Sequence, residues 1–358
     1  MTGDTLTDEQ VRTALLDYVI REFFGGHKTD SVIEHGPLQT NYFSICFWVN
    51  VRDHMGQRGI YVKIPKMILF RENHHIFPLT DEDKNLAEDE YSSLVHLSSH
   101  WPNDQTDVHF VKPLGFLRDF NAILTERFYA KHFFTMFRRV DLNRRGKKPD
   151  SVHAIMSRLG TALLNFHKTA LRECKFDSEA IVRKMQDSCS QLQSLGLTPA
   201  FGKWINSRLD ALRHLDAYTH QVNTLKGFDV RQVFINEDRT VFVLDPGKMK
   251  IDYKEIDLAR FIATNRILYW GSPLFFLRLT PHASYEKSFI EGYRRGLHLE
   301  NKILSLLVLK ELLKHWRMAY LVLESKRWPR LVKVFLRKSY IEPFYKGQIK
   351  AELLTLGT

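Results

Sequence analysis

The first third of the chain changes repeatedly between helical and strand-like spacing of apolar residues. Val11 and Leu15 begin an apolar face at helical spacing, whereas later runs are rich in β-branched and aromatic residues around short polar turns. The expected helices cover residues 5–24 and 80–101, and the expected strands lie within residues 31–51, 59–66 and 109–128. This pattern predicts a small antiparallel sheet accompanied by helices.

Beyond residue 150 the spacing becomes mostly helical. Long amphipathic segments cover residues 151–170, 178–196, 201–221, 301–325 and 327–347. One stretch interrupts them, LKGFDVRQVFINEDRTVFVLDPGK at 225–248, where two short apolar runs flank the turn NEDR and predict a hairpin. The sequence therefore predicts an α+β protein, with a sheet-containing part at 1–127 and a mostly helical part at 128–358.

Composition supports a folded chain and suggests its partners. The 358 residues are 44% hydrophobic and 26% charged, which is typical of a globular protein with one or two cores. The net charge of +11 favours anionic partners such as nucleotides or phosphorylated glycans. Three cysteines without metal-ligand spacing, and a polar N-terminus unlike a secretion signal, predict a cytoplasmic location.

Candidate chemistry begins with three residues in a fixed order along the chain. Lys63 lies within a strand-like run, Glu88 and Glu90 lie on the following predicted helix, and Asp245 ends the second strand of the hairpin. Each has a simpler explanation, because a strand lysine often faces solvent and an aspartate often caps a Pro-Gly turn. Together they match what phosphoryl transfer requires, namely a cation on the phosphates and a carboxylate on magnesium.

The segments GPLQTNYFSICFWV, GIYVKIPK and LAEDEYSSLVHL occur in the order of a phosphate-covering loop, a lysine strand and a glutamate helix. On these segments, residues 28–295 resemble the aminoglycoside and choline phosphotransferases, which share the two-lobed fold of protein kinases. The resemblance implies that ATP and Mg²⁺ are cofactors. It places Glu90, with Glu88 as the alternative, beside Lys63. The other implied nucleotide-binding residues are Thr40 and Asn41 at the loop tip and the inter-lobe hinge backbone of Thr125, Glu126, Arg127 and Phe128.

The hairpin stretch departs from the resemblance at two positions, most seriously at residue 227. The family pattern of a catalytic aspartate, four residues and an asparagine places Gly227 at the aspartate and Gln232 at the asparagine. Gln232 and Asp245 then become the implied magnesium ligands. Three interpretations remain open. Asp229 acts as the base in place of residue 227, or transfer proceeds without a protein base. In the third, the protein binds nucleotide without turnover, or binds none, and serves as a scaffold. The resemblance gives His167 and Asp257 structural roles.

These residues lead to two functional hypotheses. The first is an ATP- and magnesium-dependent phosphotransferase that acts on a hydroxyl of a small molecule or glycan. The second is a catalytically impaired protein of the same fold that binds nucleotide or a partner.

Two basic regions suggest additional contacts. The loop at 138–148 either is a solvated loop or grips a polyanionic acceptor. The C-terminal helices carry Trp316, Trp328, Phe335, Tyr340 and Phe344 among lysines and arginines. These aromatic residues either pack in the core or contact an anionic membrane peripherally. Nucleic acid is a less favoured partner, because the sequence contains no zinc-ligand set or RNA-binding signature.

Overall fold

The computed structural model describes residues 7–24, 32–41, 43–53, 56–67, 75–101, 107–135, 150–270 and 282–357. The basic loop at 138–148 lies outside these residues. In the N-terminal part, an antiparallel sheet has the strand order β1-β3-β4-β7-β6, with β2 also paired to β3. Its strands are β1 (Val32–His35), β2 (Gln39–Thr40), β3 (Ser44–Asp53), β4 (Gly56–Pro65), β6 (Pro113–Leu117) and β7 (Ala122–Glu126).

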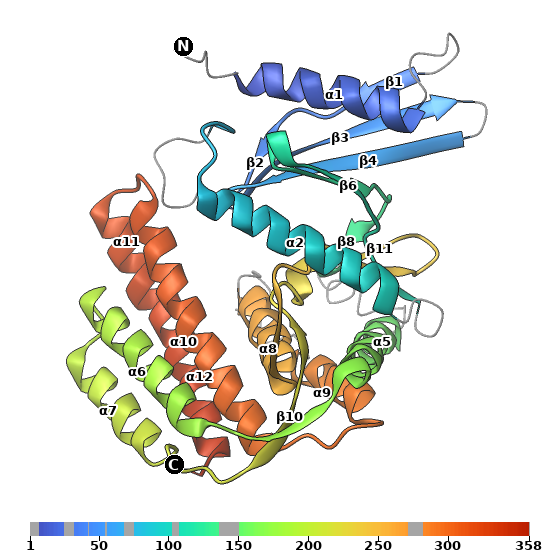
Figure 1. Cartoon of the computed structure of the whole chain (residues 1–358). Coiled ribbons are helices and arrows are strands. Elements are labelled where there is room, and N and C mark those ends of the chain that lie inside the picture. The colour runs from blue at the N-terminus through green and yellow to red at the C-terminus, as the bar shows by residue number, and fades with distance from the viewer. Residues whose placement is uncertain are drawn as a thin grey trace.

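Strand alternation gives this sheet two distinct faces. One face carries Phe47, Val62 and Leu124, which pack against helix α1 (Asp8–Phe24). The opposite face lies toward helix α2 (Asp81–His100), where Leu94 packs against Ile123. The sheet therefore lies between the two helices (Figure 1). Because side chains alternate along a strand, the apolar neighbours of Lys63 turn that lysine toward the α2 side.

The remaining chain is mainly helical, as predicted. Its helices are α5 (Asp150–His167), α6 (Ser178–Ser194), α7 (Pro199–Asp210), α8 (Glu255–Trp270), α9 (His282–Arg294), α10 (Asn301–Ser325), α11 (Arg330–Leu336) and α12 (Glu342–Thr355). A second sheet has the order β13-β10-β9, formed by β9 (Arg172–Lys175), β10 (Tyr218–Leu225) and β13 (Met249–Tyr253). One large apolar cluster joins most of these elements, although α11 and β9 contribute no residue to it.

The predicted hairpin forms as β11 (Val233–Ile235) and β12 (Val241–Val243). It belongs to a third sheet, β5-β12-β11-β8, with β5 (Val108–Phe110) and β8 (Lys131–His132) at its edges. Strand β5 lies inside the predicted N-terminal part, yet it pairs in parallel with β12. Val108 and Phe110 also belong to the core of the helical part. The boundary at 127 and 128 stays a prediction, and β5 links the two parts across it.

The close packing of α5 against α9 predicts a large stability effect at Gly160. A Cβ at this position would lie 2.1 Å from the Phe289 carbonyl oxygen, so the two backbones would have to separate. We expect Gly160→Ala to lower the free energy of unfolding by about 2 kcal/mol or more. Gly347 of α12 is the matched control, because its Cβ would meet no atom within 4 Å. Gly347→Ala should be neutral or stabilise by up to about 1 kcal/mol. Urea denaturation measures both, and equal midpoints would contradict the contact.

Candidate active site

Three charged side chains from three separate elements meet in the structure. The Lys63 ammonium, on β4, donates to Glu90 Oε1 of α2 at 2.6 Å and to Asp245 Oδ2 at 2.8 Å. Asp245 follows strand β12. The side chains of Lys63 and Glu90 are only 16% and 6% exposed. Glu90 therefore contacts Lys63, whereas Glu88 is exposed.

Because one cation is shared by two carboxylates, the pKa values in this cluster depend on one another. Burial acts to lower the pKa of Lys63, but Asp245 and Glu90 together raise it. Burial acts to raise the pKa of Asp245, but Lys63 overcomes that effect and lowers it. Burial, followed by repulsion from Asp245, raises the pKa of Glu90 from 4.5 to about 7, against the lowering effect of Lys63. Asp245 is therefore the ionised carboxylate over a wide pH range.

The raised pKa of Glu90 predicts a pH-dependent stability. Between about pH 4.5 and 7 the folded protein keeps a proton that the unfolded chain releases, so stability should fall as pH rises through this window. Glu90→Gln removes this proton linkage, so the free energy of unfolding should fall by up to about 3 kcal/mol less across this pH window. Chemical denaturation at a series of pH values measures the slope. Glu88→Gln, on the exposed side of α2, is the control, and superimposable profiles for Glu90→Gln and the natural protein would refute the prediction.

The turn after Asp245 is held in a defined position. The Gly247 amide donates to Asp245 Oδ1 at 3.0 Å, and Gly247 has a φ of 59°, which favours glycine. Beyond the turn, the Met249 amide donates to the Ser93 hydroxyl at 2.9 Å, and Lys248 pairs with Asp89 at 2.8 Å. Helix α2 therefore orients both Glu90 and the segment that carries Asp245.

Gly227 packs directly against this turn. Its amide donates to the Pro246 carbonyl at 2.7 Å, and a Cβ at 227 would lie 1.9 Å from the Asp245 carbonyl oxygen. The position that the resemblance assigns to a catalytic aspartate is therefore filled by the backbone of the Asp245 turn. In this arrangement no side chain fits at residue 227.

Asp229, the candidate base, has a local structural role. Its side chain is buried and caps the 3₁₀ helix Val230–Gln232. Arg231 contacts both carboxylate oxygens, through its backbone amide at 2.8 Å to Oδ1 and its guanidinium at 2.5 Å to Oδ2. The role of Asp229 as base stays a prediction, and Arg231 already occupies acceptor sites on both of its oxygens.

The two predicted magnesium ligands, Gln232 and Asp245, lie on neighbouring segments. The Leu244 amide donates to the Gln232 carbonyl at 2.9 Å, which brings Gln232 beside the residue that precedes Asp245. No described residue hydrogen-bonds the Gln232 side-chain amide. Among the described residues, no group of three or more His, Cys, Asp or Glu is arranged to hold a metal. This is compatible with magnesium, which typically takes one or two carboxylates and completes its shell with phosphates and water.

The predicted hinge residues lie where β7 leaves the sheet. Thr125 pairs with Tyr61 in the ladder, and the amides of Glu126 and Arg127 donate to the carbonyls of Lys112 and Gly59 at 2.9 Å each. No described residue accepts a hydrogen bond from the Phe128 amide. Of these hinge amides, only that of Phe128 is therefore available to a ligand.

The predicted phosphate-covering loop has its tip at Thr40 and Asn41, close to the strand that pairs with the Lys63 strand. Thr40 ends β2 and pairs with Ile45, and Asn41 donates to Cys46 Sγ at 3.3 Å. Cys46 lies directly opposite Lys63 in the β3–β4 register. Both predicted loop residues are exposed.

Two groups near the site were not predicted from the sequence. Tyr61, two residues before Lys63, has a pKa raised first by burial and then by Cys46, Asp245 and Glu90. His315 of α10 has a pKa lowered to about 4 by burial, and it is also affected by the charges of Glu311, Arg231 and Asp229. Tyr61 could have been found by alternation, since it shares a face with Lys63. His315 could not, because its helix is distant in the sequence.

His167 and Asp257, to which the resemblance gives structural roles, belong to one buried hydrogen-bond network. His167 is buried and bonds to the Tyr293 hydroxyl at 2.7 Å and to Asp257 Oδ2 at 3.2 Å. Asp257 in turn accepts a hydrogen bond from the Leu225 amide at 2.9 Å. This network therefore anchors the chain immediately before Lys226 and Gly227.

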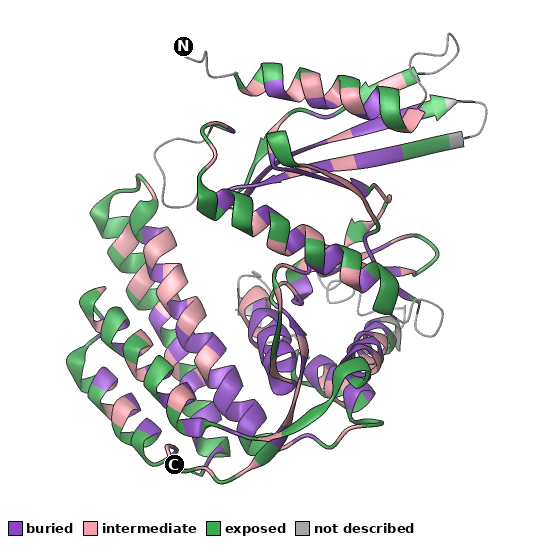
Figure 2. Ribbon diagram, in the orientation of Figure 1, coloured by how far each residue is buried: buried purple, intermediate pink, exposed green. Residues whose placement is uncertain are grey.

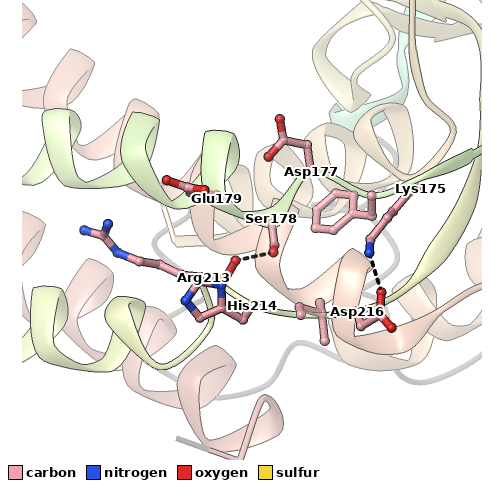
Figure 3. Close-up of a pocket in the computed structure, with 9 residues that line it drawn as sticks. Lys175, Asp177, Ser178, Glu179, Arg213, His214 and Asp216 are labelled. Carbon is pink, nitrogen blue, oxygen red and sulfur yellow. Dashed lines mark hydrogen bonds and ion pairs between the residues drawn. The ribbon is translucent and has the colours of Figure 1, made fainter.

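A separate pocket lies away from this cluster, between β9, the start of α6 and the turn after α7 (Figure 3). Lys175, Ser178, Arg213 and Asp216 contribute to its lining. None of the predicted site residues lines this pocket.

The arrangement of these elements matches several solved kinases. No protein-family model matches the sequence, and neither does any curated protein. Spectinomycin phosphotransferase APH(9)-Ia in complex with ADP and spectinomycin is 13% identical, with 95% of this chain and 98% of that chain covered, at a TM-score of 0.53. Choline kinase LicA from Streptococcus pneumoniae is 12% identical, with coverage of 96% and 99%, at a TM-score of 0.52. The ADP-bound aminoglycoside phosphotransferase APH(2'')-Ib is 10% identical, with coverage of 94% and 98%, at a TM-score of 0.54.

The chain has the fold of these phosphotransferases. The predicted α+β fold, with an antiparallel-sheet N-terminal region and a mostly helical remainder, is therefore confirmed. Within this phosphotransferase fold, the pairing of Lys63 with Glu90 and Asp245 joins the sheet, α2 and the hairpin at one site.

Proposed function

We propose that the protein is an ATP- and magnesium-dependent phosphotransferase whose acceptor is a hydroxyl of a small molecule or glycan. The main observation in support is that the Lys63 ammonium hydrogen-bonds to both Glu90 and Asp245 in a largely buried cluster. Phosphoryl transfer depends mainly on positioning and on charge stabilisation. A fixed lysine beside an ionised aspartate supplies both requirements.

Each part of the site has a role in this proposal. Lys63, oriented by Glu90, would bind the nucleotide phosphates, and the loop tip at Thr40 and Asn41 would cover them. The Phe128 amide would donate to the adenine. Asp245 and Gln232 would hold magnesium, which neutralises charge on the phosphates when bound. A carboxylate has enough acceptor sites for both a lysine and a metal.

Because residue 227 has no side chain, this position cannot supply a base that takes the proton of the acceptor hydroxyl. Asp229 is held by Arg231, so we propose that transfer relies on positioning and electrostatics rather than on a base at residue 227. The same observation favours one alternative, a protein that binds nucleotide without turnover. The two candidates predict the same nucleotide site and differ only in whether phosphate is transferred.

One experiment separates these candidates. Purified protein is titrated with ATP and magnesium while its melting temperature is followed, and ATP consumption is then measured with a panel of sugar, glycan and amino-alcohol acceptors. A melting shift together with acceptor-dependent consumption supports the phosphotransferase. A shift without consumption supports binding alone. The absence of any shift with ATP and magnesium would refute both candidates. Lys63→Met should remove the shift, and Lys84→Met, an exposed lysine on α2, should retain it.

A further inference from the structure

The segment Lys326–Lys338, with the sequence KRWPRLVKVFLRK, combines basic and apolar residues without any acidic residue. It contains six lysines and arginines in thirteen positions. The segment runs from the C-cap of α10 through α11 and into the π-helical turn Arg337–Ile341. We call it the basic-apolar segment.

Large apolar side chains of this segment face solvent. Leu331 is 83% exposed, Phe335 66% and Trp328 49%. Val332 and Val334 are also exposed, and α11 is largely exposed in Figure 2. Leu331 and Phe335 are four residues apart on α11, the spacing of neighbours on one side of a helix, and Trp328 lies just before this helix begins. Adjacent exposed apolar residues of this kind mark an interaction surface.

The other aromatic residues of the C-terminal helices behave differently. Trp316, Phe344 and Tyr345 are buried in the core of the helical part. Core packing therefore accounts for these three aromatic residues, but it does not account for Trp328 and Phe335, which are exposed. Trp328 and Phe335 are exposed within the segment where the positive charge is also concentrated.

The charges of the basic-apolar segment are only partly neutralised by described residues, among them Glu324, which lies 3.6 Å from Lys333. Arg327 and Arg330 are exposed, and neither forms an ion pair with a described residue. Arg337 and Lys338 both pair with Glu342, which also pairs with Lys346. The segment thus carries an excess of positive charge immediately beside its apolar side chains.

We infer that the basic-apolar segment docks on an anionic lipid bilayer. Apolar residues that flank cations on a short helix can enter the boundary between headgroups and acyl chains, while the cations bind anionic lipid. Among the described residues, no helix is long and apolar enough to cross a membrane. Contact would therefore lie in the plane of the surface. This inference does not depend on the proposed phosphotransfer.

Vesicle flotation with the full chain tests the inference. We expect binding to vesicles of phosphatidylcholine with phosphatidylglycerol, weaker binding to phosphatidylcholine alone, and loss of binding as salt is raised. Arg327→Ala with Arg330→Ala removes two unpaired cations and should weaken binding about 25-fold, or about fivefold for each charge. Lys287→Ala, an exposed lysine of α9, is the matched control.

A second pair of variants tests the apolar contribution. Leu331→Ser with Phe335→Ser should abolish flotation, whereas Leu354→Ser, at a position 76% exposed on α12, should not. Trp328 provides a readout that does not depend on these variants, because brominated acyl chains should quench its fluorescence. Trp328→Phe should remove the part of the protein fluorescence that these lipids quench. Failure to bind vesicles that contain phosphatidylglycerol would overturn the inference. So would a dimer, detected by light scattering, that is lost in Leu331→Ser with Phe335→Ser, because a second copy of the chain would then cover this segment.

Discussion

Asp245→Asn is expected to reduce magnesium-dependent phosphate transfer at least about a hundredfold, the scale of losing one preorganised electrostatic group. Asparagine keeps an oxygen that can accept the hydrogen bond from the Gly247 amide, so the turn should retain its shape. The substitution removes the negative charge that would bind magnesium and that pairs with Lys63. Initial rates across a range of magnesium concentrations measure the effect.

The same variant has a consequence that does not depend on catalysis. Repulsion from Asp245 helps to raise the pKa of Glu90, so that pKa should fall when residue 245 is neutral. The decline of stability between about pH 4.5 and 7 should then become shallower than in the natural protein. Asp238→Asn is the matched control, because Asp238 lies in the exposed turn of the same hairpin. Unchanged transfer in Asp245→Asn would contradict the assigned role of the residue.

Gly227→Asp should not restore a catalytic base, although it restores the acid that the resemblance places at this position. The new Cβ would lie 1.9 Å from the Asp245 carbonyl oxygen and 2.8 Å from the Pro246 carbonyl carbon. Both neighbours are backbone atoms, so the turn must move. We expect Gly227→Asp and Gly227→Ala each to lower the free energy of unfolding by about 3 kcal/mol or more. Both variants should also lose the nucleotide-induced melting shift, because displacing the turn displaces Asp245.

Comparison of Gly227→Asp with Gly227→Ala identifies the cause of the loss of stability. If backbone contact is the cause, alanine and aspartate should have similar effects on stability, measured by urea denaturation. Gly347→Ala serves as the glycine control, since its Cβ would meet no atom within 4 Å. Faster phosphate transfer in Gly227→Asp than in the natural protein would show that the loop can rearrange and that residue 227 is a true base position.

Much of the candidate site could be predicted because local patterns determine it. Alternation of apolar residues in β4 sets the direction of Lys63, and helical spacing in α2 places Leu94 and Leu97 in the core, one and two turns beyond Glu90. The apolar runs around the turn NEDR form the hairpin that precedes Asp245. His167 and Asp257, to which the resemblance gives structural roles, contact each other and the Leu225 amide.

Other features could not be predicted because they depend on side-chain conformations or on contacts between distant segments. The hold of Arg231 on Asp229 is set by side-chain rotamers in the loop. The pairing of β5 with β12 depends on how the two parts of the chain meet. The exposure of Trp328 and Phe335, in contrast to Trp316 and Phe344, depends on which side of each C-terminal helix the core covers.

The sequence by itself determined the α+β fold class, the order of Lys63, Glu90 and Asp245, and the direction in which Lys63 points, since each depends on spacing along one segment. Only the tertiary structure decided that these three residues meet, because Lys63 and Asp245 are 182 positions apart. It also decided that Gly227 is closed to any side chain. That restriction comes from the carbonyl of Asp245, a backbone atom whose position no pattern of side chains specifies.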